Sequence, residues 1–260
     1  MTPDHQIDIR FVHGLGGAPA EFDELRTRLP ASWHTGVVDL PGHAHTVAPS
    51  NGESVAAIAD LLAARLTPPT SNTVLVGHSS GGVLLLDAVS RGLITPGGLV
   101  LIDSNVPIGV AARRDKDRKA ARASRTDWWR SFLASTLEST GHRTGSATRA
   151  AIEASIQQVP RSTIITIWRA VLAYDATDAW TTCPCPVLYL RTTRSISYDD
   201  LAAARARAGV SGAPVEIVSL PRALGHYPHR SDPGRVANTV AAFVRELVIG
   251  KPIDGHRLNS

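Results

Sequence analysis

Apolar residues follow two different spacings along this chain of 260 residues. Alternating or continuous apolar runs that stop at Gly, Pro or Asp are typical of strands, whereas apolar residues three or four positions apart are typical of helices. By these criteria strands are expected at residues 7–13, 33–39, 73–76, 98–103, 186–190 and 215–220. Helices are expected between them at residues 54–66, 83–91, 201–208 and 233–247. This alternation predicts an α/β fold with a mostly parallel central sheet and helices on both faces.

The alternation is interrupted in the middle of the chain. Between residues 107 and 182 helical patterns occur without a convincing strand, at 113–125, 128–137, 148–158 and 163–173. One sheet domain, formed by residues 1–106 and 183–260, is therefore expected to contain an all-helical insertion at residues 107–182. We expect this insertion to lie as a cap over the carboxyl ends of the strands, where open α/β sheets bind their ligands.

Composition and charge exclude several classes of protein. The chain is 43% hydrophobic and 19% charged, which excludes disordered, collagen-like and coiled-coil proteins. Its apolar stretches are shorter than the ~20 residues of a membrane-spanning helix. Residues 1–10 contain no basic segment followed by an apolar run, so neither a signal peptide nor a membrane anchor is expected. We therefore expect a cytoplasmic location. The net charge is only +4 and the arginines are scattered apart from a cluster near residue 113, so no nucleic-acid partner is expected.

The chain contains two cysteines, Cys183 and Cys185. One residue separates them, a spacing that strains a disulfide and supplies too few ligands for a structural zinc site. Both are expected to be reduced thiols.

A serine flanked by glycines follows the third expected strand. The sequence Gly77-x-Ser79-x-Gly81 lies between a buried strand and a helix, which is the context of a nucleophile elbow. A side chain at either glycine position would clash in so sharp a turn, and the strained backbone exposes the serine hydroxyl. Ser79 is therefore a candidate nucleophile.

A serine hydroxyl needs a base to remove its proton, and the base needs an acid to hold its tautomer. The favoured base is His226, which follows Gly225 in a loop between the last expected strand and the last expected helix. His229, three residues later, is the nearest competitor. His78, next to Ser79, is interpreted as part of the packing of the turn.

Five motifs occur in an order that one enzyme superfamily shares. They are VHGLGG at residues 12–17, DLPGH at 39–43, GHSSGG at 77–82, PVL at 186–188 and GH at 225–226. In these motifs and their order the chain resembles the α/β-hydrolase superfamily, in particular its capped esterases and lactonases. The resemblance covers nearly the whole chain.

The resemblance implies roles for residues around Ser79. The backbone N–H groups of Leu15 and Ser80 are expected to form the oxyanion hole, which stabilises the negative oxygen of a tetrahedral intermediate. His13, Gly14 and Tyr227 are expected to border the substrate, although hydrogen bonds that stabilise a turn are the simpler interpretation of His13.

The acid of the triad departs from the family pattern. In that pattern the strand beginning Pro-Val-Leu is followed by Gly-x-x-Asp, but the corresponding positions here are Thr192 and Ser195. In some members the acid comes one strand earlier, where this chain has Asp103. Asp199 and Asp200, in the segment after Ser195, are the alternatives. Asp103 is favoured.

Four of the five tryptophans lie in the insertion, at positions 128, 129, 168 and 180. Trp128, Trp129 and Trp168, together with Trp180 and Tyr174, are candidates for lining an apolar or aromatic substrate pocket. Alternatively they hold the insertion together, and the adjacent Trp128 and Trp129 cannot both face inward on one helix. The charges in residues 113–125 alternate in sign, which predicts a solvated helix face rather than a site for acidic groups.

These features predict a serine hydrolase that cleaves an ester, a lactone or an amide of a small, largely apolar or aromatic substrate through an acyl-enzyme on Ser79. A serine at the elbow argues against an alkyl-enzyme route, which requires a carboxylate nucleophile. Three alternatives remain open: a lyase, a peptide-cleaving amidase and a non-catalytic ligand-binding protein of the same fold. Neither a metal nor an organic cofactor is expected. The expected partner is a small-molecule substrate, without nucleic acid or membrane, and the chain is expected to be a monomer or a homodimer.

Overall fold

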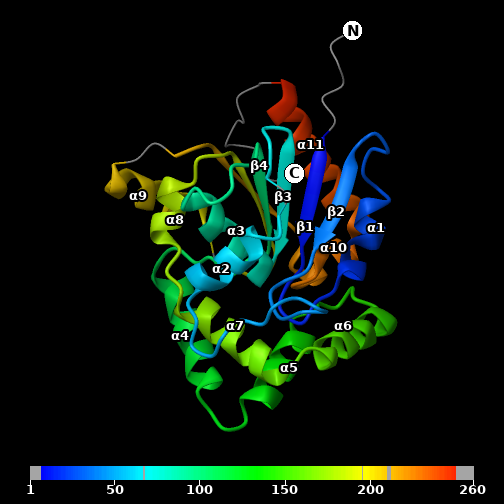
Figure 1. The fold of residues 1–260 in the computed structure, drawn as a ribbon, viewed down its shortest axis with the longest axis vertical. Coiled ribbons are helices and arrows are strands. Elements are labelled where there is room, and N and C mark those ends of the chain that lie inside the picture. The colour runs from blue at the N-terminus through cyan, green and yellow to red at the C-terminus, as the bar shows by residue number, and fades with distance from the viewer. Residues whose placement is uncertain (1–6, 67, 195, 210–211, 250–260) are drawn as a thin grey trace.

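A parallel sheet of six strands forms the centre of the protein (Figure 1). The computed structural model describes residues 7–66, 68–194, 196–209 and 212–249. The strands are β1 (Asp8–Val12), β2 (His34–Val38), β3 (Thr73–His78), β4 (Gly98–Ile102), β5 (Val187–Arg191) and β6 (Val215–Ser219), in the spatial order β2-β1-β3-β4-β5-β6. Each neighbouring pair is parallel. The predicted α/β class is therefore confirmed, and the six expected strands lie where their patterns placed them.

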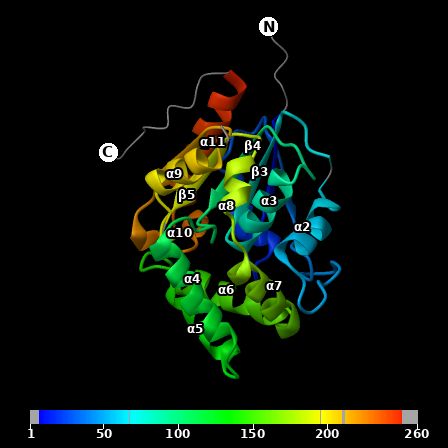
Figure 2. The same ribbon diagram turned by 90° about the vertical axis from the view of Figure 1, so that its left-hand side faces the viewer.

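Helices cover both faces of the sheet. On one face lie α2 (Val55–Ala63), α3 (Ser80–Ser90) and α9 (Tyr198–Ala208), which face the viewer in Figure 2, and on the other lie α1 (Asp23–Arg26) and α11 (Pro233–Ile249). The strands alternate between these two cores: Leu75 of β3 packs on the α3 side, whereas Val74 and Val76 pack on the α11 side. Continuous apolar strands are expected when both faces of a parallel sheet are buried.

Several one-turn elements were not expected from the sequence. They are α1 and α10 (Pro228–Ser231), together with the 3₁₀ helices η1 (Pro19–Phe22) and η2 (Arg222–Leu224). None of these elements exceeds four residues, so the 3.6-residue period has no length over which to appear. In the ranges that the structure describes, no helix combines the length and the apolar character needed to cross a bilayer.

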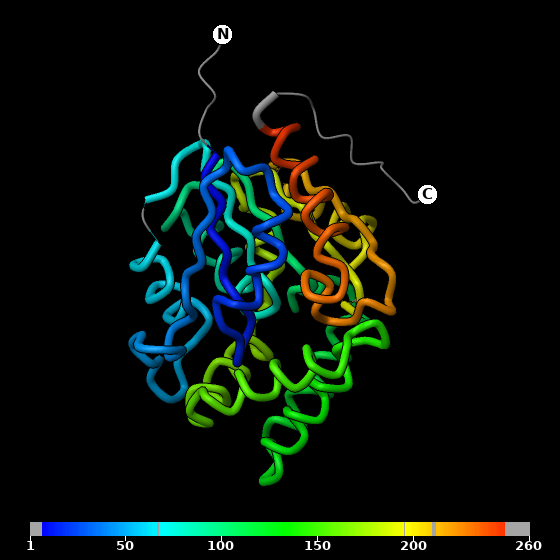
Figure 3. The backbone as a smooth tube through the Cα atoms, turned by 90° about the vertical axis from the view of Figure 1, so that its right-hand side faces the viewer, coloured from blue at the N-terminus to red at the C-terminus, as the bar shows by residue number. Residues whose placement is uncertain are grey.

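The segment between β4 and β5 is helical, as expected. Four of its helices, α4 (Val110–Ala123), α5 (Trp128–Glu138), α6 (Ser146–Gln158) and α7 (Arg161–Ala173), lie together at one end of the sheet in two perpendicular views (Figures 1 and 3). Phe132, Ile152, Ile156 and Ile164 give these helices a small apolar core of their own, which Tyr227 joins from the sheet domain.

The last helix of this segment packs against helices that cover the sheet. This helix, α8 (Thr177–Thr182), packs against α3 and α9. Trp180 is fully buried in the main core, where its Nε1–H donates to the Val106 carbonyl at 3.2 Å and its ring packs on Tyr189. The burial of this large apolar ring ties α8 to the core of the sheet domain.

The turn from β3 into α3 brings backbone segments into contact. Ser79 has φ 52° and ψ −121°, a conformation that side-chain-bearing residues rarely adopt. A Cβ on Gly81 would lie 2.4 Å from the carbonyl oxygen of His13 and 2.7 Å from that of Val12. Helix α3 can therefore approach the end of β1 only because position 81 has no side chain.

We expect Gly81→Ala to destabilise the protein by about 3 kcal/mol, because the new methyl group overlaps backbone that cannot rotate away. Chemical denaturation monitored by circular dichroism measures the free energy of unfolding. The matched control is Gly145→Ala, since a Cβ at position 145 meets no atom within 4 Å and the backbone φ is −63°. Equal stability of the two variants would contradict the close approach.

Candidate active site

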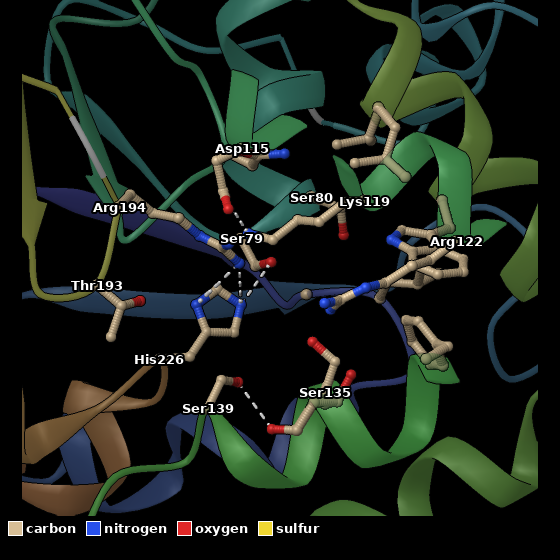
Figure 4. Close-up of a pocket in the computed structure, with 18 of the residues that line it drawn as sticks. Ser79, Ser80, Asp115, Lys119, Arg122, Ser135, Ser139, Thr193, Arg194 and His226 are labelled. Carbon is tan, nitrogen blue, oxygen red and sulfur yellow. Dashed lines mark hydrogen bonds and ion pairs between the residues drawn. The ribbon is translucent and has the colours of Figure 1, made fainter. Parts of the chain in front are cut away.

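Three side chains from three loops meet at the carboxyl end of the sheet. Ser79 stands between β3 and α3, Asp103 directly follows β4, and His226 follows η2 in the loop after β6. Ser79 Oγ–H donates to His226 Nε2 at 2.8 Å (Figure 4), and His226 Nδ1–H donates to Asp103 Oδ2 at 2.9 Å. The structure thus brings the three predicted residues into one continuous hydrogen-bond chain.

The Asp103 carboxylate is fully buried and is held by the loop that follows β5. Its Oδ1 accepts the backbone N–H groups of Thr192 at 2.9 Å, Thr193 at 3.0 Å and Arg194 at 3.2 Å. Its Oδ2 accepts the Thr193 hydroxyl at 2.6 Å besides His226. The segment in which the family pattern places the acid therefore supplies donors to an acid on the neighbouring strand.

The alternative acids lie elsewhere. Asp199 and Asp200 are exposed in the first turn of α9, and Asp200 packs near Gly109. Neither contacts His226 in the described part of the chain. Ser195, which stands where the family pattern has the acid, lies outside the described residues. Of the three carboxylates weighed from the sequence, the structure brings Asp103 to the imidazole.

Opposing effects act on the protons of this chain. Burial by itself raises the pKa of Asp103, but the hydrogen bond from His226 and the charges of His226 and Arg194 outweigh burial and hold the pKa well below its usual range. Burial and then the Arg194 charge lower the pKa of His226, whereas the hydrogen bond and the charge of Asp103 raise it. The net shift is downward, so His226 is a neutral imidazole that can accept a proton at neutral pH.

The loop that carries His226 is fixed from two further directions. The backbone N–H of His226 donates to the Ser139 carbonyl at 2.6 Å, and the His226 carbonyl accepts His78 Nε2–H at 2.8 Å. Gly225 has φ 65°, and a Cβ there would lie within 2.4 Å of the Thr140 backbone. The end of α5 and the residue before Ser79 thus both position the imidazole.

The two amides expected to form an oxyanion hole border the same space. Leu15 and Ser80 both line the cavity above Ser79, and among the described residues neither N–H has a hydrogen-bond acceptor. The turn that presents Leu15 is held by the N–H of Gly16, which donates to Nε2 of the buried His43 at 2.9 Å. His43 therefore stabilises the turn rather than contacting a ligand.

The cavity has a volume of about 500 Å³ and a mixed lining. Of the residues expected to border a substrate, Gly14, Trp168 and Tyr227 line it. The rest of its apolar wall comes chiefly from α5 and α7, through Phe132, Val171 and Leu172.

Three residues expected to bind the substrate do not line this cavity. His13 is fully buried beneath it, with Nδ1–H donating to the Gly14 carbonyl at 2.9 Å and Nε2 lying 3.1 Å from Asp39 Oδ1. Trp128 and Trp129 pack on one another with ring centroids 5.5 Å apart, and Arg161 covers the Trp129 ring at 4.7 Å. These rings hold the inserted helices together, because the inner face of α5 presents Phe132 instead.

Tyr174 and Trp180, the other aromatic candidates, are also absent from this lining. Tyr174 borders a separate cleft with Lys116, and Trp180 is in the main core.

Sequence reasoning missed the charged residues of the site. Helix α4 was expected to present a solvated charged face, and Arg118 and Arg122 are indeed exposed, but this face also borders the cavity, which is lined by Asp115, Arg118, Lys119 and Arg122. Their spacing of three and four residues places them on one face of the helix, which is the signal that could have found them. Arg194 also lines the cavity, with a guanidinium nitrogen 3.3 Å from His226 Nε2 and 3.4 Å from Nδ1.

A buried polar cluster lies behind the elbow. Glu21, His78 and His229 place potential metal-ligand atoms within 4.8 Å of one another, the one such trio among the described residues. Oε2 of Glu21 lies 3.8 Å from His78 Nδ1 and 3.7 Å from His229 Nε2. His229 also stacks on Phe22 with ring centroids 5.0 Å apart. His229 therefore sits behind His78, outside the chain formed by Ser79 and His226.

A strained serine after the third strand and a histidine after the last strand of a parallel sheet define an α/β-hydrolase fold and site. The chain belongs to the α/β hydrolase family, whose family model matches residues 11–239.

Part of the chain is similar in sequence to curated esterases. Over 91 residues the chain is 38% identical to a pimeloyl-[acyl-carrier protein] methyl ester esterase of Neisseria meningitidis serogroup B, a match that covers 34% of this chain and 33% of that protein. The chain thus matches about a third of the length of these curated relatives.

Solved structures resemble the whole chain in fold. The enol-lactonase from Burkholderia xenovorans LB400 superimposes with a TM-score of 0.72 at 18% identity, covering 95% of this chain and 94% of that one. A thermophilic esterase from Thermogutta terrifontis gives a TM-score of 0.68 at 21% identity, covering 93% of this chain and 90% of that one.

We expect Arg194→Gln to raise the pKa of His226, because the variant removes a cation that disfavours the imidazolium. Titration of the His226 ring by NMR measures the change. The matched control is Arg222→Gln, which removes a cation that lines the same cavity without any hydrogen bond to the imidazole. An unchanged or lower pKa in Arg194→Gln would show that the guanidinium does not act on His226.

The buried histidines predict a loss of stability in acid. Burial, followed by the Arg230 charge, lowers the pKa of His229 from 6.5 to about 3, and burial followed by the His13 charge does the same for His43. The folded state keeps these rings neutral whereas the unfolded state binds protons below pH 6.5, so their contribution to stability is complete above pH 6.5 and is lost as the pH falls toward 3.

We expect His229→Phe, which preserves the stacking on Phe22, to reduce the pH dependence of the free energy of unfolding between pH 6 and 4 by about 1.4 kcal/mol per pH unit. Urea denaturation at several pH values measures it. The same replacement at the exposed His45 is the control. A slope like that of the wild type in His229→Phe would mean that this ring is protonated in the folded state.

Proposed function

We propose that the protein is a carboxylic ester hydrolase that acts on a small molecule through an acyl-enzyme on Ser79. The observation that carries the proposal is the hydrogen-bond chain from Ser79 through His226 to the buried Asp103, at the base of a cavity of about 500 Å³. Acyl transfer requires a hydroxyl bound to an imidazole whose other nitrogen donates to a carboxylate.

In the proposed mechanism, Ser79 Oγ attacks the carbonyl carbon while His226 Nε2 takes the hydroxyl proton. Asp103 holds the ring and stabilises the imidazolium. The N–H groups of Leu15 and Ser80 donate to the oxyanion, and His226 then protonates the departing alcohol oxygen. A water molecule, deprotonated by the same imidazole, hydrolyses the acyl-enzyme and restores Ser79.

The relatives support an ester or a lactone as the scissile group. The protein from Neisseria meningitidis is named as a methyl ester esterase, and the structural relatives include an esterase and an enol-lactonase. A lactone is a cyclic ester and needs the same groups in the same order, so both substrates fall within the proposal.

The backbone at the site supports catalysis over a non-catalytic binding function. Ser79 has φ 52° and Asp103 has φ 43°, and each such conformation costs of the order of 1–3 kcal/mol. A pocket that only binds gains nothing from that strain, whereas a nucleophile and its acid gain their alignment with His226. A peptide-cleaving amidase would use the same residues and the same acyl-enzyme on a different substrate, whereas a lyase would use Ser79 and His226 to move protons without acylation.

Helices α4 to α7 are proposed to act as the cap that selects the substrate. Phe132 from α5 and Trp168, Val171 and Leu172 from α7 contribute apolar surface to the cavity. Such a wall suits a hydrocarbon chain or an aromatic ring next to the scissile bond.

We expect a fluorophosphonate to label Ser79 in the wild type and not in Ser79→Ala, as intact-mass spectrometry would measure. Hydrolysis of a p-nitrophenyl ester should fall by at least ~10⁴-fold in Ser79→Ala and by about 10³- to 10⁴-fold in Asp103→Asn.

The matched control for the acid is Asp199→Asn, an exposed carboxylate that should leave turnover unchanged. Unlabelled Ser79 in folded protein would rule out acyl transfer by this residue. Turnover that survives in Ser79→Ala for one substrate class would assign that reaction to proton transfer without acylation.

A further inference from the structure

The cavity above Ser79 concentrates positive charge. Five cationic side chains line it, together with one carboxylate, that of Asp115. The cations are Arg118, Lys119, Arg122, Arg194 and Arg222. The excess of four positive charges equals the net charge of the whole chain, +4. Outside this lining the sequence therefore contains equal numbers of cationic and acidic residues.

Three of these cations approach the hydrogen-bond chain from two sides. Figure 4 shows Lys119 and Arg122 extending from α4 toward Ser79, and Arg194 extending from the opposite side. Arg194 is the nearest to the triad, with its guanidinium 3.3 Å from His226 Nε2. The three positive groups thus border the space that a substrate must occupy to reach Ser79.

Carboxylates of the protein neutralise part of this cluster: Asp103 Oδ2 lies 3.9 Å from Arg194 Nε. Asp115 accepts from Lys119 at 2.7 Å and from Arg118 at 3.2 Å, so one carboxylate serves two cations. In the described part of the chain the Arg122 guanidinium has no hydrogen bond or ion pair. By contrast Arg113, on the same helix outside the cavity, makes two bonds to Asp175 at 2.6 and 3.0 Å.

Lys119 and Arg194 line the same cavity from opposite sides (Figure 4). Burial and then the charge of Arg194 lower the pKa of Lys119, and the hydrogen bond and charge of Asp115 raise it, with a net lowering. A bound anion would offset the positive charge and would be attracted most by Lys119 and Arg194, whose side chains are 24% and 19% exposed. A planar carboxylate also fits the donor geometry of an arginine.

The remainder of the cavity is apolar. Phe132, Trp168, Val171 and Leu172 line it on the side of α5 and α7. A fitting ligand therefore has a hydrocarbon or aromatic body for this wall and a negative group for the cations.

On the basis of the proposed ester hydrolase, we infer that the natural substrate is an anionic ester, one that carries a free carboxylate besides its scissile carbonyl. Lys119, Arg122 and Arg194 bind the carboxylate, and the apolar wall binds the carbon skeleton between the two groups. The charged face of α4 then determines specificity.

The test measures binding in Ser79→Ala, so that its result does not depend on acyl transfer. Isothermal titration calorimetry compares monomethyl adipate with dimethyl adipate, and monomethyl isophthalate with dimethyl isophthalate. Within each pair the two ligands share a skeleton and a methyl ester and differ in one negative charge. We expect the monoanion to bind at least tenfold more tightly in one pair or in both.

The preference should depend on the cations of the cavity. Adding Arg122→Gln or Lys119→Gln to Ser79→Ala should reduce the ratio of the two dissociation constants at least threefold, and Arg122→Lys should retain most of it. The matched control is Arg114→Gln, an exposed cation on α4 that does not line the cavity and whose loss changes the net charge equally.

Ratios below twofold in both pairs would overturn the inference, as would a preference that survives the combined loss of Lys119 and Arg122. If in that case the wild type still hydrolyses neutral esters and is labelled at Ser79, the proposed hydrolase stands and its anionic substrate does not. If instead the monoanion binds more tightly but the fluorophosphonate never labels Ser79 in the wild type, the anionic ligand stands and the proposed hydrolase does not.

Discussion

The arrangement of the site depends on the buried carboxylate of Asp103, which needs hydrogen-bond donors on all sides. An ionised group with no exposed surface is stable only if several donors replace its water. Three backbone N–H groups, one hydroxyl and one imidazole do so here. Those donors fix the loop after β5 relative to the end of β4, and they fix the ring of His226 toward Ser79. A change in the spacing of β4 and β5 would therefore move the proposed base as well.

The central strands supply the alignment that this carboxylate requires. The N–H of Ser79 donates to the Ile102 carbonyl at 3.0 Å, and the N–H of Asp103 donates to the Leu190 carbonyl at 2.7 Å. Each bond continues the sheet by one residue past the end of a strand, where the backbone then turns to positive φ. Sheet hydrogen bonds thus hold both strained residues, and the two side chains leave the sheet side by side. The strain is supported by the most deeply buried strands of the protein.

Local patterns predicted most of the fold and part of the site. The elbow and the loop of Gly225 and His226 were predictable because each depends on a few adjacent residues and on the strand before them. Asp103 could be favoured from strand order, but its donors could not, since Thr192 and Thr193 have no sequence pattern that marks them as partners. The aromatic residues of the insertion were misassigned in part, because packing among α5, α6 and α7 decides which ring faces the cavity. The charged face of α4 likewise borders the cavity because of where α4 lies relative to the sheet, which the sequence pattern of this helix does not reveal.

The unusual position of the acid and the charge of the cavity are connected through the loop after β5. In the pattern typical of the family this loop carries the acid. Here the backbone N–H groups of the loop and the Thr193 hydroxyl hold Asp103. The Arg194 side chain donates to the Asp103 carbonyl at 3.3 Å, lies against His226 and faces the cavity. Asp103 raises the pKa of the imidazole and Arg194 lowers it. The same loop therefore holds the group that raises this pKa and carries the group that lowers it. A negative ligand at Arg194 would weaken the lowering, which means that substrate charge and the basicity of His226 are coupled through a single side chain.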